Sequence, residues 1–269
     1  MNYDTLMDVL RRLALEGGAK IMEIYNADDF DVKVKSDESP VTEADEAADA
    51  IISAGLRAAF PDVALVTEEQ AASHTQAVST FLIVDPLDGT KEYRGLRDDW
   101  AVHVALTVEG QCALGAVALP SQDRVVWGVS LPGQERAGLE GDGELARGDT
   151  ESPKTVRIAC SRSHTPDWME SFVGTFEDHT LVRAGSVGNK VSLCLLGEAD
   201  VYAHQRGLKE WDTCAPEVIG RALGWSVFKL DGSEHTYNLP DPKNHEFVIC
   251  RPAVKDHVVE ALRSAGVTS

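Results

Sequence analysis

Two aspartates three residues apart, in the run Asp85-Pro86-Leu87-Asp88-Gly89-Thr90, are of a type and spacing that suit metal chemistry. The apolar residues 81–84 predict a buried strand that ends at Asp85, where the following proline favours an extended conformation. Asp88-Gly89 is typical of a turn, and residues 90–93 predict the first turn of a short helix. Carboxylate oxygens at such a corner suit Mg²⁺, and the free N–H groups of Gly89 and Thr90 suit a phosphate oxygen. The run therefore indicates a metal-dependent phosphatase, and a plain turn cap is the structural alternative.

Three further acidic residues lie at the ends of predicted elements. Glu68 follows residues 63–67, which predict a second strand, so its carboxylate and that of Asp85 are expected at one sheet edge. Asp45 lies in Thr42-Glu43-Ala44-Asp45, which resembles a capping box at the start of a helix. Asp212 lies at the start of a later predicted helix. From the residues alone, helix capping explains Asp45 and Asp212 at least as well as a catalytic role does.

The composition limits what the chain can do. It has 269 residues, of which 43% are hydrophobic, and a formal net charge of −19. This charge argues against non-specific binding to nucleic acid or to an anionic membrane surface. It does not exclude an anionic small substrate, because salt screens exposed charges beyond about 8 Å.

No transmembrane run and no signal peptide is recognised in the sequence, so we expect a cytoplasmic protein. The five cysteines are far apart and form no C-x-x-C pair, and we expect buried, reduced thiols rather than a zinc site or disulfides.

The pattern of elements differs between the two halves of the chain. Amphipathic helices are predicted for residues 4–25 and from Thr42 to the run Phe60-Pro61-Asp62, which ends the second one. The β-rich runs 100–108, 113–119 and 125–129 predict an antiparallel meander. Residues 133–148 are rich in glycine and are interpreted as hairpin turns. The second half alternates predicted strands and helices, which favours an α/β layer. We predict a boundary near residues 148–153, which gives domains 1–150 and 151–269.

Four motifs in this order resemble the inositol monophosphatase superfamily, a group of lithium-sensitive, Mg²⁺-dependent phosphomonoesterases. They cover nearly the whole chain: Ser39-Pro40-Val41-Thr42-x-Ala44-Asp45, then Glu68-Glu69, then Asp85-Pro-x-Asp-Gly-Thr, then Trp211-Asp212. The resemblance implies a layered αβαβα sandwich, a mixed α+β and α/β fold. Tyr93 and Thr67 depart from the residues common at their positions, but neither departure removes a ligand.

Within that superfamily the chain looks most like the 3′(2′),5′-bisphosphate nucleotidases of the CysQ type. Three features carry this resemblance: the run Trp211-Asp212-Thr213-Cys214-Ala215-Pro216-Glu217, the loop Ser161-x-Ser-His164, and the element Gly188-Asn189-Lys190. The substrate it implies is adenosine 3′,5′-bisphosphate or its sulfated analogue, as in sulfur assimilation and nucleotide recycling. Lys190 as a solvated helix residue and His164 as a locally bonded loop residue remain open alternatives.

The resemblance also implies a role for each matching residue. Two or three Mg²⁺ ions would be held by Glu68, Asp85, the Leu87 carbonyl, Asp88 and Asp212. Asp45 and Thr90 would orient and activate the attacking water. The substrate would contact Gly89, Thr90, Ser161, His164, Ser186, Lys190 and Asp212. His103 is given no role, because alternation only places it on one face of a strand.

Other functions are compatible with parts of this pattern. An inositol-1-phosphate or fructose-1,6-bisphosphate phosphatase would use the same metal chemistry. A non-catalytic metal or nucleotide sensor could keep the fold, although it would not need Asp45 and Thr90. We expect a small phosphorylated nucleotide as partner and neither nucleic acid nor membrane, and a homodimer is left open.

Overall fold

The computed structural model describes residues 2–27, 32–34, 40–75, 78–237, 242 and 246–267. In the first half, the helices are α1 (Tyr3–Tyr25), α2 (Glu43–Ala59), η1 (Ala71–Thr75), α3 (Thr90–Arg94) and η2 (Pro120–Gln122). The strands of this half are β1 (Val32–Val34), β2 (Pro40–Thr42), β3 (Ala64–Thr67), β4 (Phe81–Asp88), β5 (Ala101–Val108), β6 (Gln111–Leu119), β7 (Arg124–Val129) and β8 (Arg136–Glu140).

The second half again contains helices and strands, in alternation. Its strands are β9 (Val156–Ser161), β10 (His179–Ala184), β11 (Val201–His204), β12 (Ser226–Phe228) and β13 (Phe247–Cys250). Its helices are α4 (Met169–Val173), α5 (Val187–Leu195), α6 (Glu210–Ala222), η3 (Pro252–Val254) and α7 (Lys255–Ser264).

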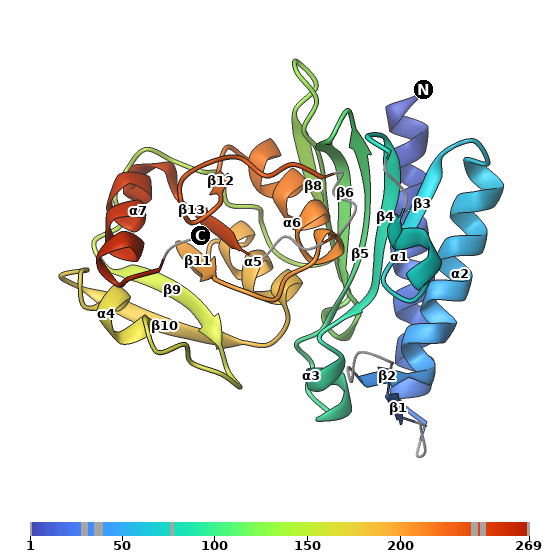
Figure 1. The fold of residues 1–269 in the computed structure, drawn as a ribbon, viewed down its shortest axis with the longest axis horizontal. Coiled ribbons are helices and arrows are strands. Elements are labelled where there is room, and N and C mark those ends of the chain that lie inside the picture. Colours follow the sequence, from blue (N-terminus) through green and yellow to red (C-terminus); the bar gives the residue numbers. More distant parts are fainter. Residues whose placement is uncertain are drawn as a thin grey trace.

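Five layers of helix and sheet alternate through the molecule (Figure 1). Helices α1 and α2 cover one face of a six-stranded sheet, and α5 and α6 lie between that sheet and a five-stranded one. Helices α4 and α7 cover the far face of the second sheet. The predicted αβαβα sandwich is therefore confirmed. Its layers are held together by three apolar clusters: one under α1 and α2, one that surrounds α5 and α6 and reaches both sheets, and one under α4 and α7.

The two sheets have different strand orders. The first runs β3-β4-β5-β6-β7-β8, with β3 parallel to β4 and the remaining neighbours antiparallel, which confirms the predicted meander. The second runs β10-β9-β11-β13-β12, and its first three strands are parallel. The predicted boundary near residue 150 falls between β8 and β9, and the division into two domains stays a prediction.

Two local predictions were wrong. Strand β4 does not end at Asp85: it continues to Asp88, and its pairing with β5 shifts register between the two aspartates. Pro86 is tolerated because it lies in this irregular stretch, where its missing N–H removes no regular pairing. The glycine-rich stretch is also not turns alone, since β8 lies within it and pairs with β7.

Candidate active site

The irregular end of β4 turns both aspartates of the central motif toward one volume. The Leu87 N–H donates to Asp85 Oδ1 at 3.1 Å, which fixes the orientation of that carboxylate. Gly89 follows with φ of 100°, a left-handed conformation that glycine adopts without strain. A Cβ at Gly89 would lie 2.9 Å from the Ser186 Cβ, so the chain also comes too close here for any side chain.

Three carboxylates that are distant along the chain meet at this point. Oxygens of Asp85, Asp88 and Asp212 all lie within 4.8 Å of one another, and the first two residues are buried. Asp212 comes from the first turn of α6, where its Oδ2 also accepts from the Lys209 N–H at 2.5 Å. The capping role that the sequence offered for Asp212 is therefore present, and it coexists with membership of the cluster.

Glu68 lies beside this cluster but outside the group of three among the described residues. Its N–H donates to the Val84 carbonyl at 3.1 Å, and its charge is among the influences that raise the pKa of Asp85, Asp45 and Asp212. The predicted convergence of the ends of β3 and β4 is thus seen in the backbone.

Burial and mutual repulsion perturb the cluster. Burial, together with the charges of Glu68 and Asp88, raises the pKa of Asp85 well above its ordinary value. Burial and the charge of Asp88 raise the pKa of Asp212 to about 7. For Asp88, burial acts in the same direction but is outweighed by His103 and two backbone N–H groups, so its pKa is lowered. Closely packed carboxylates of this kind favour binding of a divalent cation, which relieves their repulsion.

The raised pKa of Asp212 predicts how pH affects the metal-free protein. Between the ordinary carboxyl value near 4 and about 7, the folded state holds a proton on Asp212 that the unfolded state has lost. This carboxyl therefore makes the protein less stable as pH rises through that window. We expect D212N to melt above the wild type by about 4 °C at pH 7.5 in EDTA and to show a much smaller difference at pH 4.5. Thermal scans across pH measure this, and a constant difference would contradict the assignment.

Asp45 divides its two oxygens between Thr42, at the start of its own helix, and Thr90. Oδ2 accepts from the Thr42 N–H at 2.7 Å and from the Thr42 hydroxyl at 2.5 Å, which completes the predicted capping box. Oδ1 lies 3.1 Å from the Thr90 Oγ1, which donates to it. The Leu87 carbonyl lies 3.3 Å from the same hydroxyl. The structure thus brings Asp45 and Thr90 together from α2 and α3.

A second group of contacts fixes the turn that carries Glu68. The Thr67 hydroxyl donates to the buried Asp49 on α2, and the Thr67 carbonyl lies 2.8 Å from His74 Nε2. The His74 ring is 4.8 Å from the ring of Trp211, the neighbour of Asp212. The end of β3 is therefore connected to the start of α6.

His103, to which the sequence assigned no role, lies directly behind Asp88. Its Nε2 is 3.3 Å from Asp88 Oδ2, and its Nδ1 is 3.3 Å from the Trp211 carbonyl. The N–H groups of Val187 and Gly188, at the start of α5, donate to Asp88 at 3.1 and 2.6 Å. A Cβ at Gly188 would lie 2.3 Å from the histidine ring, so glycine permits this approach. The sequence carried no signal for this contact, because it follows from the register in which β4 and β5 pair, with His103 opposite Asp85.

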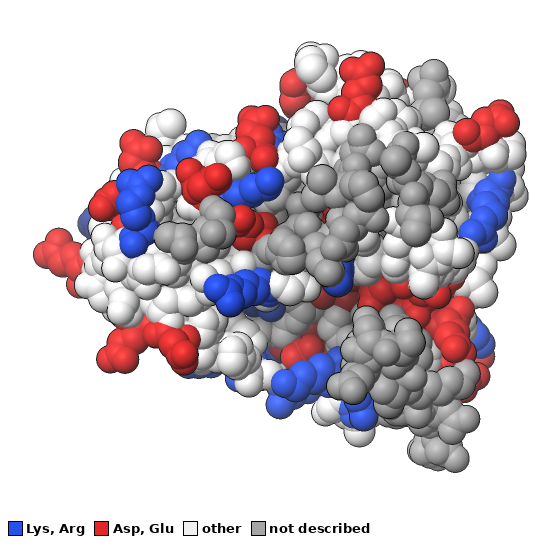
Figure 2. All heavy atoms as spheres, in the orientation of Figure 1, with Lys and Arg blue, Asp and Glu red and all other residues white. Residues whose placement is uncertain are grey.

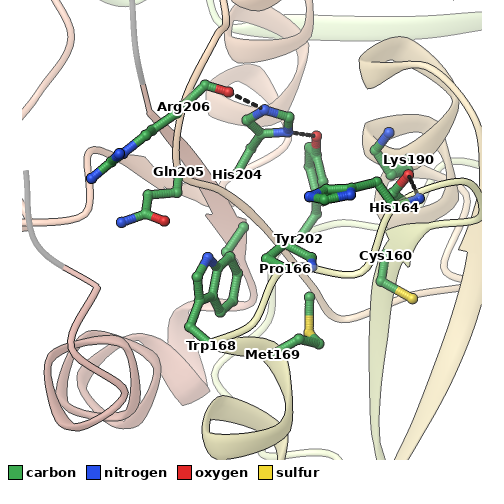
Figure 3. A pocket seen from close by; sticks show the side chains of 12 residues that line it. Cys160, His164, Pro166, Trp168, Met169, Lys190, Tyr202, His204, Gln205 and Arg206 are labelled. Atoms are coloured by element: carbon green, nitrogen blue, oxygen red, sulfur yellow. Dashed lines mark hydrogen bonds between the residues drawn. The ribbon is translucent and has the colours of Figure 1, made fainter.

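The residues expected to contact substrate fall into two groups. Ser161, His164 and Lys190 line one cavity of about 280 Å³ (Figure 3). Ser161 Oγ accepts from the N–H groups of Ser163 and His164, which shapes the loop after β9. Ser186, in contrast, lies beside Gly89 and caps α5 through its contacts with Asn189.

The surface around these groups is mixed in charge. Acidic side chains lie in the recess that crosses the middle of the molecule, and Lys and Arg side chains lie close to it (Figure 2). Among the described residues, no helix is long and apolar enough to cross a bilayer. All five cysteines are buried and free, as expected.

Comparisons with known proteins agree with this geometry. The chain is 30% identical over 237 residues to the 3′(2′),5′-bisphosphate nucleotidase CysQ of Salmonella typhimurium, covering 86% of this chain and 94% of that protein. It is 33% identical to the 3′-phosphoadenosine 5′-phosphate phosphatase of Mycobacterium tuberculosis, covering 82% of this chain and 81% of that protein. The crystal structure of CysQ from Bacteroides thetaiotaomicron superposes with a TM-score of 0.78 at 26% identity, over 93% of this chain and 98% of that one. The model of the inositol monophosphatase family matches residues 2–266, and the chain belongs to that family.

Proposed function

We propose that the chain is a Mg²⁺-dependent phosphomonoesterase that removes the 3′-phosphate from adenosine 3′,5′-bisphosphate or its sulfated analogue. One observation carries the proposal: the start of α5 links the cluster of Asp85, Asp88 and Asp212 to a cavity, because Gly188 donates to Asp88 and the buried Lys190, two residues later, lines the cavity. The names of the relatives, one a CysQ nucleotidase and one a phosphoadenosine phosphate phosphatase, support the same substrate class.

The donor set fits magnesium. Carboxylate and carbonyl oxygens are its preferred protein ligands, and Asp85, Asp88, Asp212, the neighbouring Glu68 and the Leu87 carbonyl would hold it. When bound, such ions neutralise charge on the phosphate and lower the pKa of water. The raised pKa of Asp85 supports this assignment, because burial and repulsion leave that carboxylate in need of a counter-charge.

The protein's own groups would supply the remaining chemistry. Thr90, whose hydroxyl donates to Asp45, can accept a proton from water and pass its own to that carboxylate. The N–H groups that follow the left-handed Gly89 can hold phosphate oxygens. His103 and the start of α5 hold Asp88 in place, so that its orientation depends on both halves of the chain.

Release of inorganic phosphate tests the proposal. Adenosine 3′,5′-bisphosphate, inositol 1-phosphate and fructose 1,6-bisphosphate are compared at equal concentration, with Mg²⁺ and with EDTA. We expect the highest kcat/KM for the nucleotide and no turnover in EDTA. A higher kcat/KM for inositol 1-phosphate would identify an inositol phosphatase instead, and no release from any of the three at saturating Mg²⁺ would reject a phosphatase.

Replacing Lys190 by methionine should raise KM for the nucleotide by about 10- to 100-fold, because hydrogen bonds to charged groups contribute about 1.5–3 kcal/mol. Lys190 is 5% exposed, and its Nζ lies 3.3 Å from the Gly185 carbonyl and 5.3 Å from the centre of the Tyr202 ring. The second anionic group of the bisphosphate would be its partner. K20M, on the surface of α1, is the control and should leave KM unchanged. Equal KM values for K190M and the wild type would remove Lys190 from the site.

A further inference from the structure

The cavity beside the acidic cluster has one apolar side and one polar side. Its apolar lining comes mainly from Pro166, Trp168, Met169 and Ala203, while Lys190 lies on the polar side. Trp168 and Met169 lie opposite Tyr202 and Lys190 (Figure 3). A volume of about 280 Å³ between such walls suits a flat group that packs against the apolar side and is met by hydrogen-bonding groups on the polar side.

Trp168 contributes a hydrogen-bond donor without a partner to the lining of the cavity. Its Nε1 is buried and has no hydrogen-bond partner among the described residues, although a buried indole N–H usually has one. The ring is fixed from behind by Phe172, whose centroid is 5.8 Å away in an edge-on arrangement. The indole nitrogen lies on the side of the ring away from α4, facing His204 and Gln205 (Figure 3). An indole N–H only donates, so the missing partner is an acceptor.

The opposite wall is fixed by a chain of hydrogen bonds. The Tyr202 hydroxyl lies 3.0 Å from His204 Nδ1, and His204 Nε2 lies 2.7 Å from the Arg206 carbonyl. A neutral imidazole satisfies both contacts, accepting from the tyrosine and donating to the carbonyl. Burial and Lys190 lower the pKa of His204 to about 4, which agrees with the neutral form. The loop that faces Trp168 is therefore held in place before any ligand binds.

The cavity and the cluster both border the start of α5. Gly188 donates to Asp88, and Lys190, two residues later on α5, lines the cavity. The charge of Asp88 also acts on Lys190 and on Tyr202. A ligand whose phosphate lies at the cluster can therefore place an attached ring in the cavity.

We propose that this cavity binds a heteroaromatic base and that Trp168 determines its selectivity, by packing against the base and donating from Nε1 to a ring nitrogen or carbonyl oxygen. The proposal deepens the nucleotidase function and depends on it only for the identity of the substrate. Trp168 does not contact the reacting atoms, so its loss should act on recognition of the base and not on the chemical step.

Binding of adenosine 5′-monophosphate, measured by calorimetry, tests the proposal without turnover. We expect W168A to bind about 10- to 100-fold more weakly than the wild type, since stacking of a base on an aromatic ring contributes about 1–3 kcal/mol. W168F keeps a flat apolar face, so its affinity for AMP should fall by only about 3- to 10-fold. W225F is the control: Trp225 is buried and lies outside the cavity lining, its Nε1 donates to the Ala146 carbonyl, and its change should leave binding unaltered.

Base analogues separate recognition from a merely structural role. AMP analogues in which N1, N3 or N7 is replaced by a CH group are compared with AMP. At one of these positions the replacement should weaken binding to the wild type by about 3- to 10-fold and leave the affinity of W168F unchanged. In turnover assays, W168A should raise KM for the nucleotide and leave kcat/KM for inositol 1-phosphate unchanged.

Wild-type affinity for AMP in a folded W168A protein would overturn the proposal. Equal losses of kcat/KM for the nucleotide and for inositol 1-phosphate in W168A would overturn it too. Turnover of the nucleotide with no effect of Trp168 would reject this inference alone. Binding of AMP that depends on Trp168, without turnover, would reject the nucleotidase function alone.

Discussion

Replacing Asp85 by asparagine is expected to lower kcat by about 10³-fold or more while raising the melting temperature of the metal-free protein. The loss follows because a metal ligand contributes to several kcal/mol of charge stabilisation in the transition state. The gain in stability follows because burial and the neighbouring charges of Glu68, Asp88 and Asp212 already disfavour the ionised form of Asp85. Asparagine keeps an oxygen for the Leu87 N–H and removes the charge. Phosphate release and thermal scans in EDTA measure the two effects.

Asp200 offers a matched control on a different buried aspartate. Its carboxylate accepts from Arg157 Nε at 2.9 Å and from Arg251 Nε at 2.6 Å, and burial is outweighed by these guanidinium groups, so its pKa is lowered. D200N should therefore lower stability by about 3 kcal/mol, because two guanidinium groups lose the buried carboxylate that they share, and leave kcat nearly unchanged. A loss of stability in D85N like that in D200N would contradict the interpretation of Asp85 as a strained ligand.

The local parts of the site could be predicted because each depends on residues close in sequence. The turn at Asp88-Gly89, the capping box of Thr42 and Asp45, and the helix that starts at Glu210 are each encoded within a few residues. The order of these motifs also sufficed to recognise the family and, with it, the layered fold.

The contacts between these parts could not be predicted, because they depend on strand register and on how the layers pack. Local pattern placed Asp45 and Asp212 only in caps; their second contacts, with Thr90 and with Asp85, arise when α2, α6 and β4 meet. His103 was overlooked for the same reason, since its proximity to Asp88 follows from the pairing of β4 with β5. Trp168 is a plain helix-start residue in the sequence, and its unmatched N–H becomes visible only in the folded cavity.

The pairing of Asp45 with Thr90 predicts that the two residues act as one unit. D45N should lower kcat by about 10²- to 10⁴-fold, because the amide cannot take up the proton that Thr90 passes on. T90A should lower kcat by a similar factor, whereas T90S keeps the hydroxyl and should lower kcat much less. KM and the stabilisation of the protein by Mg²⁺ should change little in D45N, because the cluster of Asp85, Asp88 and Asp212 stays intact.

The double variant D45N/T90A separates a relay from two independent contributions. If the hydroxyl works only by passing its proton to this carboxylate, the second substitution removes no further contribution. The kcat of the double variant should then lie within about threefold of that of the slower single variant. T42V controls for the cap, because it removes the Thr42 hydroxyl from Asp45 Oδ2 and leaves Oδ1 and its contact with Thr90. It should cost about 1 kcal/mol of stability and far less activity than D45N. Multiplicative losses in the double variant would mean that Asp45 serves α2 as a cap and that Thr90 acts on the phosphate alone.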